Sequence, residues 1–368
     1  MARGLPSPKL DSLILFVTNA CNLRCGFCCY AEHLNRSRDM SEAELVRISE
    51  TAPRFRALLV SGGEPFLRTD LATVLLAFAR NNGVRSVNIP TNGWYVDRTL
   101  ATCDTFLGAA DAVTLNVSVS VDGLAETHDR IRGKNGSFDR LCTTLSALER
   151  RRDRYANLRV RVNTVVTPEN VTQVRELVDW FDDRFDLDEH ALAIVRDRTW
   201  LGTWDARPER DDLAQEFVQL VRYASAKYAS RSRPEVGSVP APIGRMMSFA
   251  HARAMADVKR DRMNGRRWGF PCTAGRNILV VSGSGALAAC EHRPPVLDLR
   301  DFDFDVTAAL STGAMRAERE RIEADRCDCL HGCFIGNSLQ HSPVALVRRE
   351  APHALGYVAE RARRSVRP

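Results

Sequence analysis

The sequence lacks long apolar runs and any segment typical of secretion. No stretch approaches the roughly 18 consecutive apolar residues that a membrane helix needs, and residues 1–11 contain no apolar core of signal-peptide length. We therefore expect a cytoplasmic protein that has no contact with a membrane. Internal repeats and low-complexity segments are absent as well. With 44% apolar and 27% charged residues among 368, the composition is that of a globular protein with room for one large and one smaller domain.

Basic residues are in slight excess, but their arrangement is not that of a nucleic-acid-binding protein. The formal net charge is +6, and much of it comes from two arginine-rich runs at residues 150–154 and 361–367. Neither run is interleaved with aromatic residues, and no nucleic-acid recognition motif accompanies them. We expect solvated surfaces at both runs and no nucleic-acid partner.

The eleven cysteines are not expected to form disulfides, because a chain without a secretory signal stays in a reducing compartment. Metal ligation or thiol reactivity is the expected use instead. Most of the cysteines fall into two sets. Cys103 and Cys142 stand alone in helix-like segments, where we expect them to be small core hydrophobes.

The first set follows an apolar run and has the spacing C-x3-C-x2-C, formed by Cys21, Cys25 and Cys28. Three thiolates this close can bind three corners of a cubane iron–sulfur cluster and leave the fourth iron open to a small ligand. Gly26 is expected to let the backbone fold back between them. The alternative is a structural zinc site, which needs four ligands and would have to recruit Cys29.

Short apolar runs alternate six times with amphipathic segments in the first half of the chain. The strand-like runs are residues 13–17, 57–61, 86–90, 113–121, 158–166 and 191–195. Ser41 with Glu44 forms a capping box, Asp70 is expected to cap the second helix, Gly83 to end it, and Ser137 to open the fourth. This alternation predicts an α/β fold with a parallel sheet, an open partial (βα)6 TIM barrel over residues 10–200. Ligands of such folds collect at the carboxyl ends of the strands.

The second half of the chain has a different pattern. Residues 201–269 predict a helical bridge, with helices at 211–227 and 244–264. Residues 270–345 predict a small, cysteine-rich α+β domain that begins with two short strands. Residues 346–368 form a basic C-terminal tail.

The cysteine loop carries Phe27 directly before Cys28, and with this aromatic residue the spacing resembles the signature of the radical SAM superfamily. The resemblance implies that S-adenosylmethionine chelates the open iron of a 4Fe-4S cluster through its amino and carboxylate groups. It also implies that one electron splits this cofactor into methionine and a 5′-deoxyadenosyl radical. Such an enzyme needs a reductant of the flavodoxin or ferredoxin type.

Further motifs stand at the ends of the next strands. Residues 60–65 resemble the GGEP motif of the same superfamily, which implies that Gly62, Gly63 and Glu64 hold the amino group of S-adenosylmethionine. Two glycines let backbone approach a ligand, and a carboxylate accepts hydrogen bonds from an ammonium group. The third strand ends at Asn92, which is expected to face the same site.

The fourth strand has an unusually polar face. Period-two alternation places Asn116, Ser118 and Ser120 together, and the serines are either cavity-lining groups or satisfied core hydroxyls. The S-x-D-G sequence that starts at Ser120 resembles family members in which this serine and a downstream arginine, here Arg132, contact the ribose and carboxylate of S-adenosylmethionine. Asn163 on the fifth strand is expected to line the same cavity.

The second set begins with Cys272 and Cys290, which a hairpin with a turn at Gly285 would bring side by side. The spacing C-x12-G-x4-C resembles the opening of SPASM and twitch domains, which implies an auxiliary 4Fe-4S cluster. Three further thiols follow in the spacing C-x-C-x3-C. We predict Cys272, Cys290, Cys329 and Cys333 as ligands, with Cys327 as the replacement. A zinc ribbon built from the same thiols is the alternative.

The leading functional hypothesis is oxidation of a small molecule, such as an aminosugar, cyclitol or nucleoside, by a radical dehydrogenase. Only about eleven residues precede the first strand, whereas peptide-modifying relatives commonly carry a peptide-binding domain there. Peptide crosslinking or modification is the second hypothesis, and a non-catalytic zinc or iron–sulfur interaction protein is the third. Candidate acid–base or substrate-binding residues are His190, Arg196 and Glu291, chosen by position alone.

Overall fold

The computed structural model describes residues 9–36, 38–196, 210–236 and 239–365. One sheet of nine strands has the order β6-β5-β4-β3-β2-β1-β7-β8-β9. Its first six strands are β1 (Ser12–Thr18), β2 (Ala57–Gly62), β3 (Ser86–Thr91), β4 (Thr114–Ser120), β5 (Leu158–Val166) and β6 (Glu189–Ile194). These six pair in parallel. Since β6 and β9 lie at opposite edges, the described sheet is an open, partial barrel, and the predicted fold is confirmed.

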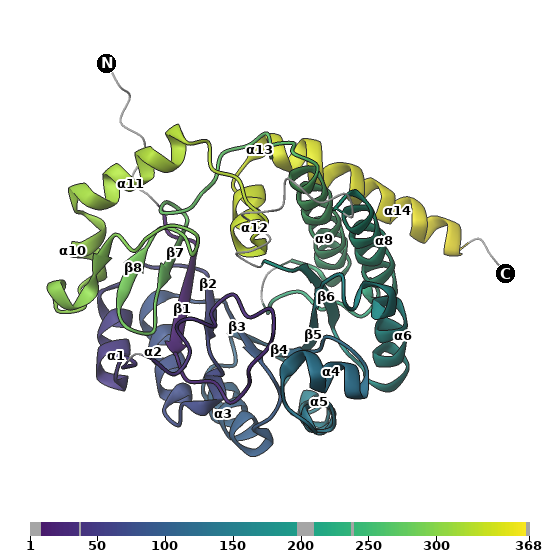
Figure 1. Cartoon of the computed structure of the whole chain (residues 1–368), viewed down its shortest axis with the longest axis horizontal. Helices are drawn as coiled ribbons and strands as arrows, with labels where there is room; N and C mark the ends of the chain where they lie inside the picture. The colour runs from purple at the N-terminus through teal and green to yellow at the C-terminus, as the bar shows by residue number, and fades with distance from the viewer. Residues whose placement is uncertain (1–8, 37, 197–209, 237–238, 366–368) are drawn as a thin grey trace.

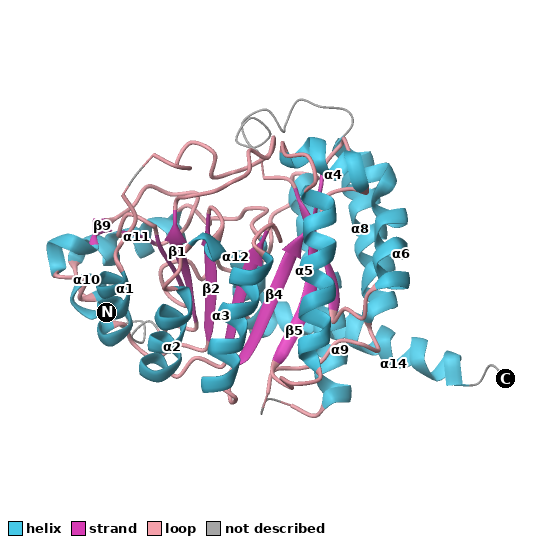
Figure 2. Cartoon of the chain, turned by 90° about the horizontal axis from the view of Figure 1, so that it is seen from below, coloured by secondary structure: helices cyan, strands magenta, loops and turns pink. Residues whose placement is uncertain are grey.

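Helices follow the strands and cover the outer side of the curved sheet (Figures 1 and 2). They are α1 (Glu42–Thr51), α2 (Leu71–Asn82), α3 (Val96–Ala109), α4 (Ala125–Arg132), α5 (Ser137–Arg152) and α6 (Val174–Arg184). β1 is buried along its whole length, because the helices cover one face and the barrel interior covers the other. Cys103 is fully buried in this core and Cys142 packs against it, as predicted.

Helix boundaries agree with the sequence signals in part. The capping box of Ser41 and Glu44 is present, and Gly83 ends α2 in the left-handed conformation. Asp70 stands at the start of α2 but its side chain caps nothing, because its carboxylate accepts from Arg68 instead. Ser137 is the first residue of α5, and its hydroxyl donates to Asp129 at 2.8 Å.

The cysteine-rich segment continues the sheet of the barrel. β7 (Ile278–Val281) pairs in parallel with β1, and then runs antiparallel to β8 (Ala286–Ala288), which pairs with β9 (Leu297–Asp298). The predicted hairpin is therefore present, and Gly285 adopts a φ of 97° in its turn. The free edge of β1 explains why this segment adds strands to the existing sheet. The expected boundary between residues 200 and 201 lies outside the described residues.

Long helices cover the remaining side of the barrel. α8 (Arg210–Tyr228) contacts β6, and α9 (Ala241–Met263) contacts α8, α12 and α14. The remaining helices are α10 (Val306–Leu310), α11 (Gly313–Ala324), α12 (Gly332–Gln340), α13 (Pro343–Ala345) and α14 (Ala351–Ser365). Most of the predicted basic tail is thus helical and packs on α9, although the far end of α14 extends from the body in Figure 1. None of the helices in the described ranges is long and apolar enough to cross a membrane.

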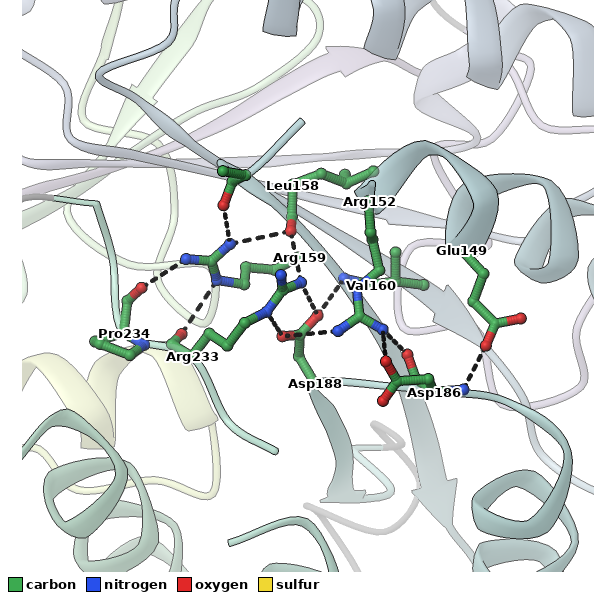
Figure 3. Close-up of polar contacts among 10 residues, drawn as sticks. Glu149, Arg152, Leu158, Arg159, Val160, Asp186, Asp188, Arg233 and Pro234 are labelled. Carbon is green, nitrogen blue, oxygen red and sulfur yellow. Dashed lines mark hydrogen bonds and ion pairs between the residues drawn. The ribbon is translucent and has the colours of Figure 1, made fainter. Parts of the chain in front are cut away.

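A polar network fastens the segment between α8 and α9 to the amino ends of β5 and β6 (Figure 3). Asp188 lies between Arg233 and Arg152, at 2.6 Å from Arg233 Nε and 3.8 Å from Arg152 Nη2. Its carboxylate also accepts from the backbone N–H of Val160 at 2.8 Å. Arg159 donates to the carbonyl oxygen of Pro234. This network lies at the end of the barrel opposite to the carboxyl ends of the strands, and we regard it as structural.

Candidate active site

The first cysteine loop leaves the carboxyl end of β1 and is hydrogen-bonded to the loop after β2. The backbone N–H groups of Gly63 and Glu64 donate to the carbonyl oxygens of Thr18 and Ala20, at 2.9 and 2.8 Å. The approach is so close that a Cβ atom on Gly63 would lie 2.1 Å from the Ala20 oxygen. A side chain at position 63 is therefore excluded by contact.

The last turn of α4 holds the cysteine loop from the other side. The N–H groups of Arg24 and Gly26 donate to the carbonyl oxygens of Arg132 and Ile131, at 3.3 and 3.2 Å. These carbonyls belong to the end of a helix, where no helical partner exists for them. Gly26 has no positive φ and a Cβ there would meet nothing within 4 Å. The expectation that the loop needs glycine at this position is therefore wrong.

Backbone N–H groups are directed at the thiols of this loop. Cys21 Sγ accepts from the N–H of Leu23 at 3.5 Å, and Cys28 accepts from the N–H of Tyr30. Arg132 Nη1 lies 3.6 Å from Cys25 Sγ. Donors of this kind stabilise negative charge on sulfur. Burial raises the pKa of Cys28 to about 11, so metal binding at this loop has to release protons.

Glu64 is fully enclosed at the centre of these contacts. Its carboxylate accepts from Thr91 Oγ1 at 2.9 Å and from the N–H groups of Asn92 and Phe66 at 2.7 and 3.2 Å. Burial raises its pKa to about 7, although these hydrogen bonds act in the opposite direction. A carboxylate so placed, beside the cysteine loop, would gain from a neighbouring ammonium group.

Asn92 connects two loops of the site. Its Nδ2 donates to Asn22 Oδ1 within the cysteine loop at 2.9 Å, and its Oδ1 accepts from the N–H of Trp94. Both ends of the amide are therefore engaged inside the protein. A cofactor contact through this side chain stays a prediction, and the contacts seen here give it a loop-positioning role.

Arg132 pairs with Asp122, which lies just beyond β4 and is fully buried. Burial raises the pKa of the Asp122 carboxyl, and the Arg132 charge opposes that shift. The Nε of Arg132 is buried without a hydrogen-bond partner. This unsatisfied donor is consistent with the predicted contact between Arg132 and a cofactor carboxylate.

The predicted polar face exists at the carboxyl half of β4. Ser118 and Ser120 are partly accessible, whereas the intervening valines are fully buried. Ser120 is the register partner of Asn163 on β5, and Ser118 that of Arg161. Asn163 is also partly accessible. These polar side chains therefore share one face of neighbouring strands, which suits a wall of a polar cavity.

Four thiols of the second set gather between the β7–β8 hairpin and the segment before α12. Cys272, Cys290, Cys327 and Cys329 all pack in or against one hydrophobic cluster. They act on one another electrostatically. Backbone N–H groups again point at sulfur, at 3.3 Å from His292 to Cys290 and 3.4 Å from His331 to Cys329.

Cys333 is different, since it belongs to the first turn of α12 and is exposed. The charged groups that act on the Cys333 thiol are those of Glu291, Arg196 and Lys259. Cys329 acts on Arg196 and Lys259 as well, and which of Cys327, Cys329 and Cys333 complete the ligand set stays a prediction. Arg293 Nη1 lies 3.5 Å from Cys327 Sγ.

A group of charged side chains lies between the two thiol sets. Arg196, just past β6, places Nη2 at 3.7 Å from Cys29 Sγ and Nη1 at 3.5 Å from Glu291 Oε2. Glu291 Oε1 lies 2.9 Å from His331 Nε2. Because His331 Nδ1 accepts from the N–H of Cys333, its ring proton belongs on Nε2 and faces Glu291. Two predicted residues, Arg196 and Glu291, are therefore neighbours.

His190 does not join this group. It is buried, its Nε2 lies 2.8 Å from Thr164 Oγ1, and its ring contacts those of Phe181 and Tyr228. Six residues of extended chain, about 20 Å, separate it from Arg196. Burial lowers the pKa of His190 to about 3. These surroundings are those of a core histidine.

In the described ranges no three His, Cys, Asp or Glu side chains come close enough to share one metal ion. Both sets consist of thiols, the ligands that iron–sulfur clusters use. A cluster at the second set stays a prediction from the sequence.

Some residues of the site were not predicted from the sequence. Asp122, His331 and Lys259 take part in it, and Cys29 contacts Arg196. His331 could have been found, since it lies inside the C-x-C-x3-C motif. Lys259 could not, because an isolated lysine in a basic helix gives no signal.

Comparison with known proteins agrees with this geometry. The family model of the Radical SAM superfamily matches residues 15–181. The chain is 31% identical over 178 residues to Fe-coproporphyrin III synthase of Methanosarcina barkeri (strain Fusaro / DSM 804), covering 48% of this chain and 42% of that relative. It is 25% identical over 291 residues to AdoMet-dependent heme synthase of the same organism, covering 76% of each chain. The chain thus spans less than half the length of the first of these relatives.

The fold is shared with a solved structure, native anSMEcpe with bound AdoMet. The TM-score is 0.56 at 15% identity, with 84% of this chain and 82% of that chain covered. An open α/β barrel with a three-thiol loop after its first strand defines a class of cofactor-dependent enzymes. Residues 15–181 form a radical SAM domain, of a superfamily whose members use S-adenosylmethionine and a 4Fe-4S cluster.

Proposed function

We propose that this radical SAM enzyme abstracts a hydrogen atom from a small molecule and oxidises it, converting a secondary alcohol to a ketone. An aminosugar, a cyclitol or a nucleoside is the proposed substrate class. The observation that carries the proposal is the second group of four thiols, Cys272, Cys290, Cys327 and Cys329. A second cluster at these thiols would accept the electron that remains after hydrogen abstraction.

Different residues of the chain bind the cofactor and the substrate. Cys21, Cys25 and Cys28 hold the first cluster, which supplies, with S-adenosylmethionine, a carbon-centred radical. Glu64 accepts from the cofactor ammonium group, and Arg132 donates to its carboxylate through the unsatisfied Nε. A flavodoxin or ferredoxin type protein delivers the electron.

Ser118, Ser120 and Asn163, on the polar face of β4 and β5, provide hydrogen-bond partners for S-adenosylmethionine. The group around Arg196 binds the substrate. Glu291, paired with Arg196 and His331, is the proposed acceptor of the proton that ketone formation releases. Its position between both thiol sets supports that assignment.

A second candidate is a porphyrin-related substrate. It is favoured by the match to AdoMet-dependent heme synthase, which covers 76% of both chains. Peptide modification is a further alternative, in which a separate partner presents the peptide.

Reductive cleavage of S-adenosylmethionine tests the core of the proposal. Anaerobically reconstituted enzyme with dithionite should form 5′-deoxyadenosine, and Cys25→Ala should not. Activity that survives in C25A overturns the assignment of the first cluster. Substrate class is tested with alcohols deuterated at the carbinol carbon, since deuterium should appear in 5′-deoxyadenosine. If only a porphyrin or a peptide stimulates cleavage, the small-alcohol assignment is wrong.

A further inference from the structure

Lys259 is a buried lysine whose ammonium group has no carboxylate partner among the described residues. It lies in α9, its exposed fraction is 4%, and no carboxylate or other hydrogen-bond partner contacts it in the parts of the chain that the structure describes. On one side the Phe217 ring centroid is 5.4 Å from Nζ. Burying a charge without a partner is costly, so this position requires a reason.

The opposite side of the ammonium group faces the start of α12. A Cβ atom on Gly332, the first residue of that helix, would lie 3.7 Å from Nζ. In the first turn of this nine-residue helix the N–H of Cys333 donates to His331 Nδ1, and the other N–H groups carry a partial positive charge. With no side chain at Gly332, the helix end stays open toward the lysine.

Arg196 adds a second positive charge. It acts electrostatically on Lys259, and its Nη1 lies 3.5 Å from Glu291. Glu291 therefore balances one of the two cations, and the other positive charge stays unbalanced among the described residues. Together, the first turn of α12, Lys259 and Arg196 form a local excess of positive charge. One anionic group bound there would neutralise this excess.

This excess of charge lies beside the first cysteine loop. Arg196 Nη2 is 3.7 Å from Cys29 Sγ, and Cys29 directly follows Cys28. A ligand held between Lys259 and Arg196 would therefore border the place where the radical forms. A small cavity of about 70 Å³ reaches Lys259 from the side of β6, and Glu189, His190 and Phe217 are among the residues that line it.

We propose that Lys259, Arg196 and the first turn of α12 bind an anionic group of the substrate, a carboxylate or a phosphate. The proposal rests on the proposed function, because it assumes a substrate between the two thiol sets. It narrows the substrate class to small molecules that carry a negative charge. The competing role for Lys259 is charge compensation for a cluster at the second thiol set, since Cys329 and Cys333 also act on it.

Anion binding to the reconstituted enzyme is the test, measured by isothermal titration calorimetry at constant ionic strength. Inorganic phosphate and acetate are the probes, and the tighter one identifies the anionic group. Lys259→Met removes the charge and keeps an unbranched side chain. Lys227→Met is the matched control, because Lys227 lies on α8 and is paired with Asp179 and Asp182. We expect K259M to weaken binding at least about tenfold and K227M to leave it unchanged.

The proposal is overturned if the wild type binds neither probe, or if K259M binds both as the wild type does. An unchanged affinity with a shifted midpoint potential of the second cluster would give Lys259 the charge-compensating role instead. If K259M does not fold, Arg196→Gln replaces it and should show the same loss of affinity. Dithionite-driven cleavage of S-adenosylmethionine needs no substrate, so its failure counts against the proposed function and not against the anion site.

Discussion

Arg132 Nη1 lies 3.6 Å from Cys25 Sγ, while Nη2 of the same guanidinium pairs with Asp122. One side chain therefore joins the end of β4 to the cysteine loop. The backbone around Arg132 does the same, since its carbonyl accepts from the N–H of Arg24. The loop that carries the first cluster depends on a charge pair that lies entirely within the protein.

Replacing Asp122 by Asn should destabilise the enzyme, because it leaves the Arg132 charge buried without a partner. We expect the free energy of unfolding to fall by about 3 kcal/mol and cleavage of S-adenosylmethionine to slow. Urea unfolding followed by circular dichroism measures the first effect. Glu50→Gln is the control, because it breaks the exposed pair with Arg47 and should cost less than about 1 kcal/mol. Equal losses in both variants would contradict the role given to Asp122.

Glycine is required at position 63 and not at position 26. Gly63→Ala places a methyl group against the Ala20 carbonyl and should displace the cysteine loop. A displacement of about 1 Å costs on the order of 100-fold in rate, measured as 5′-deoxyadenosine formation, and iron content should fall. Gly26→Ala, in the same loop, should stay within a few-fold of wild type. Loss of activity in G26A alone would show that the loop conformation described here is wrong.

The grouping of thiols predicts which cysteines bind the second cluster. Cys327→Ser should reduce iron from about eight to about four per chain, because Cys327 lies among Cys272, Cys290 and Cys329. Cys333→Ser should keep all the iron, because Cys333 faces Arg196 and Lys259 instead. Iron and sulfide counting after anaerobic reconstitution decides between them. The opposite pattern would restore Cys333 as the ligand and Cys327 as the spare thiol.

Periodic patterns made the barrel predictable, since each apolar run of the first half became a strand of the parallel sheet. The hairpin after Cys272 was predictable for the same reason, but its attachment to β1 was not. Pairing β7 with β1 depends on which edge of the sheet stays free, and a local pattern contains no such information. Asp70 shows a similar limit, because the capping signal does not show that its carboxylate accepts from Arg68 instead of capping α2.

Cysteine spacing predicts which thiols share a loop, whereas contacts between charged residues far apart in the chain could not be predicted. Cysteine spacing fixes which thiols lie close together within one loop. Spacing cannot tell Cys327 from Cys333, because the choice depends on how α12 turns away from the hairpin. Lys259 joins the site only because α9 packs against α12, a contact between segments about 70 residues apart that no motif encodes.

Asp188 should be essential for stability although it is far from the thiols. It accepts from Arg233 and the N–H of Val160, forms an ion pair with Arg152, and is 2% exposed at its side chain (Figure 3). Asp188→Asn should lower the free energy of unfolding by about 3 kcal/mol, because Arg233 and Arg152 lose the buried carboxylate that they share. Asp186→Asn is the control, since Asp186 is 69% exposed in the same network and should cost less than about 1 kcal/mol. Similar urea midpoints for the two variants would contradict this assignment.

His190 should make the fold sensitive to acid without affecting catalysis. Thr164 Oγ1 donates to the Val121 carbonyl, so it accepts from His190 Nε2, and Nδ1 is left without a partner. The folded pKa of about 3 lies below the unfolded value of about 6.5. The contribution of neutral His190 to the free energy of unfolding is therefore complete above pH 6.5. It is lost as the pH falls toward 3.

Between pH 7 and pH 5, protonation linked to His190 should lower the free energy of unfolding of the wild type by about 2 kcal/mol. The free energy of unfolding of His190→Gln should fall by about 2 kcal/mol less over the same interval. Urea unfolding at the two pH values measures the difference. If His190 were a general base, replacing it would instead shift the pH profile of turnover. We expect that profile to be unchanged in H190Q, and a shift of its limbs would place His190 in the reaction after all.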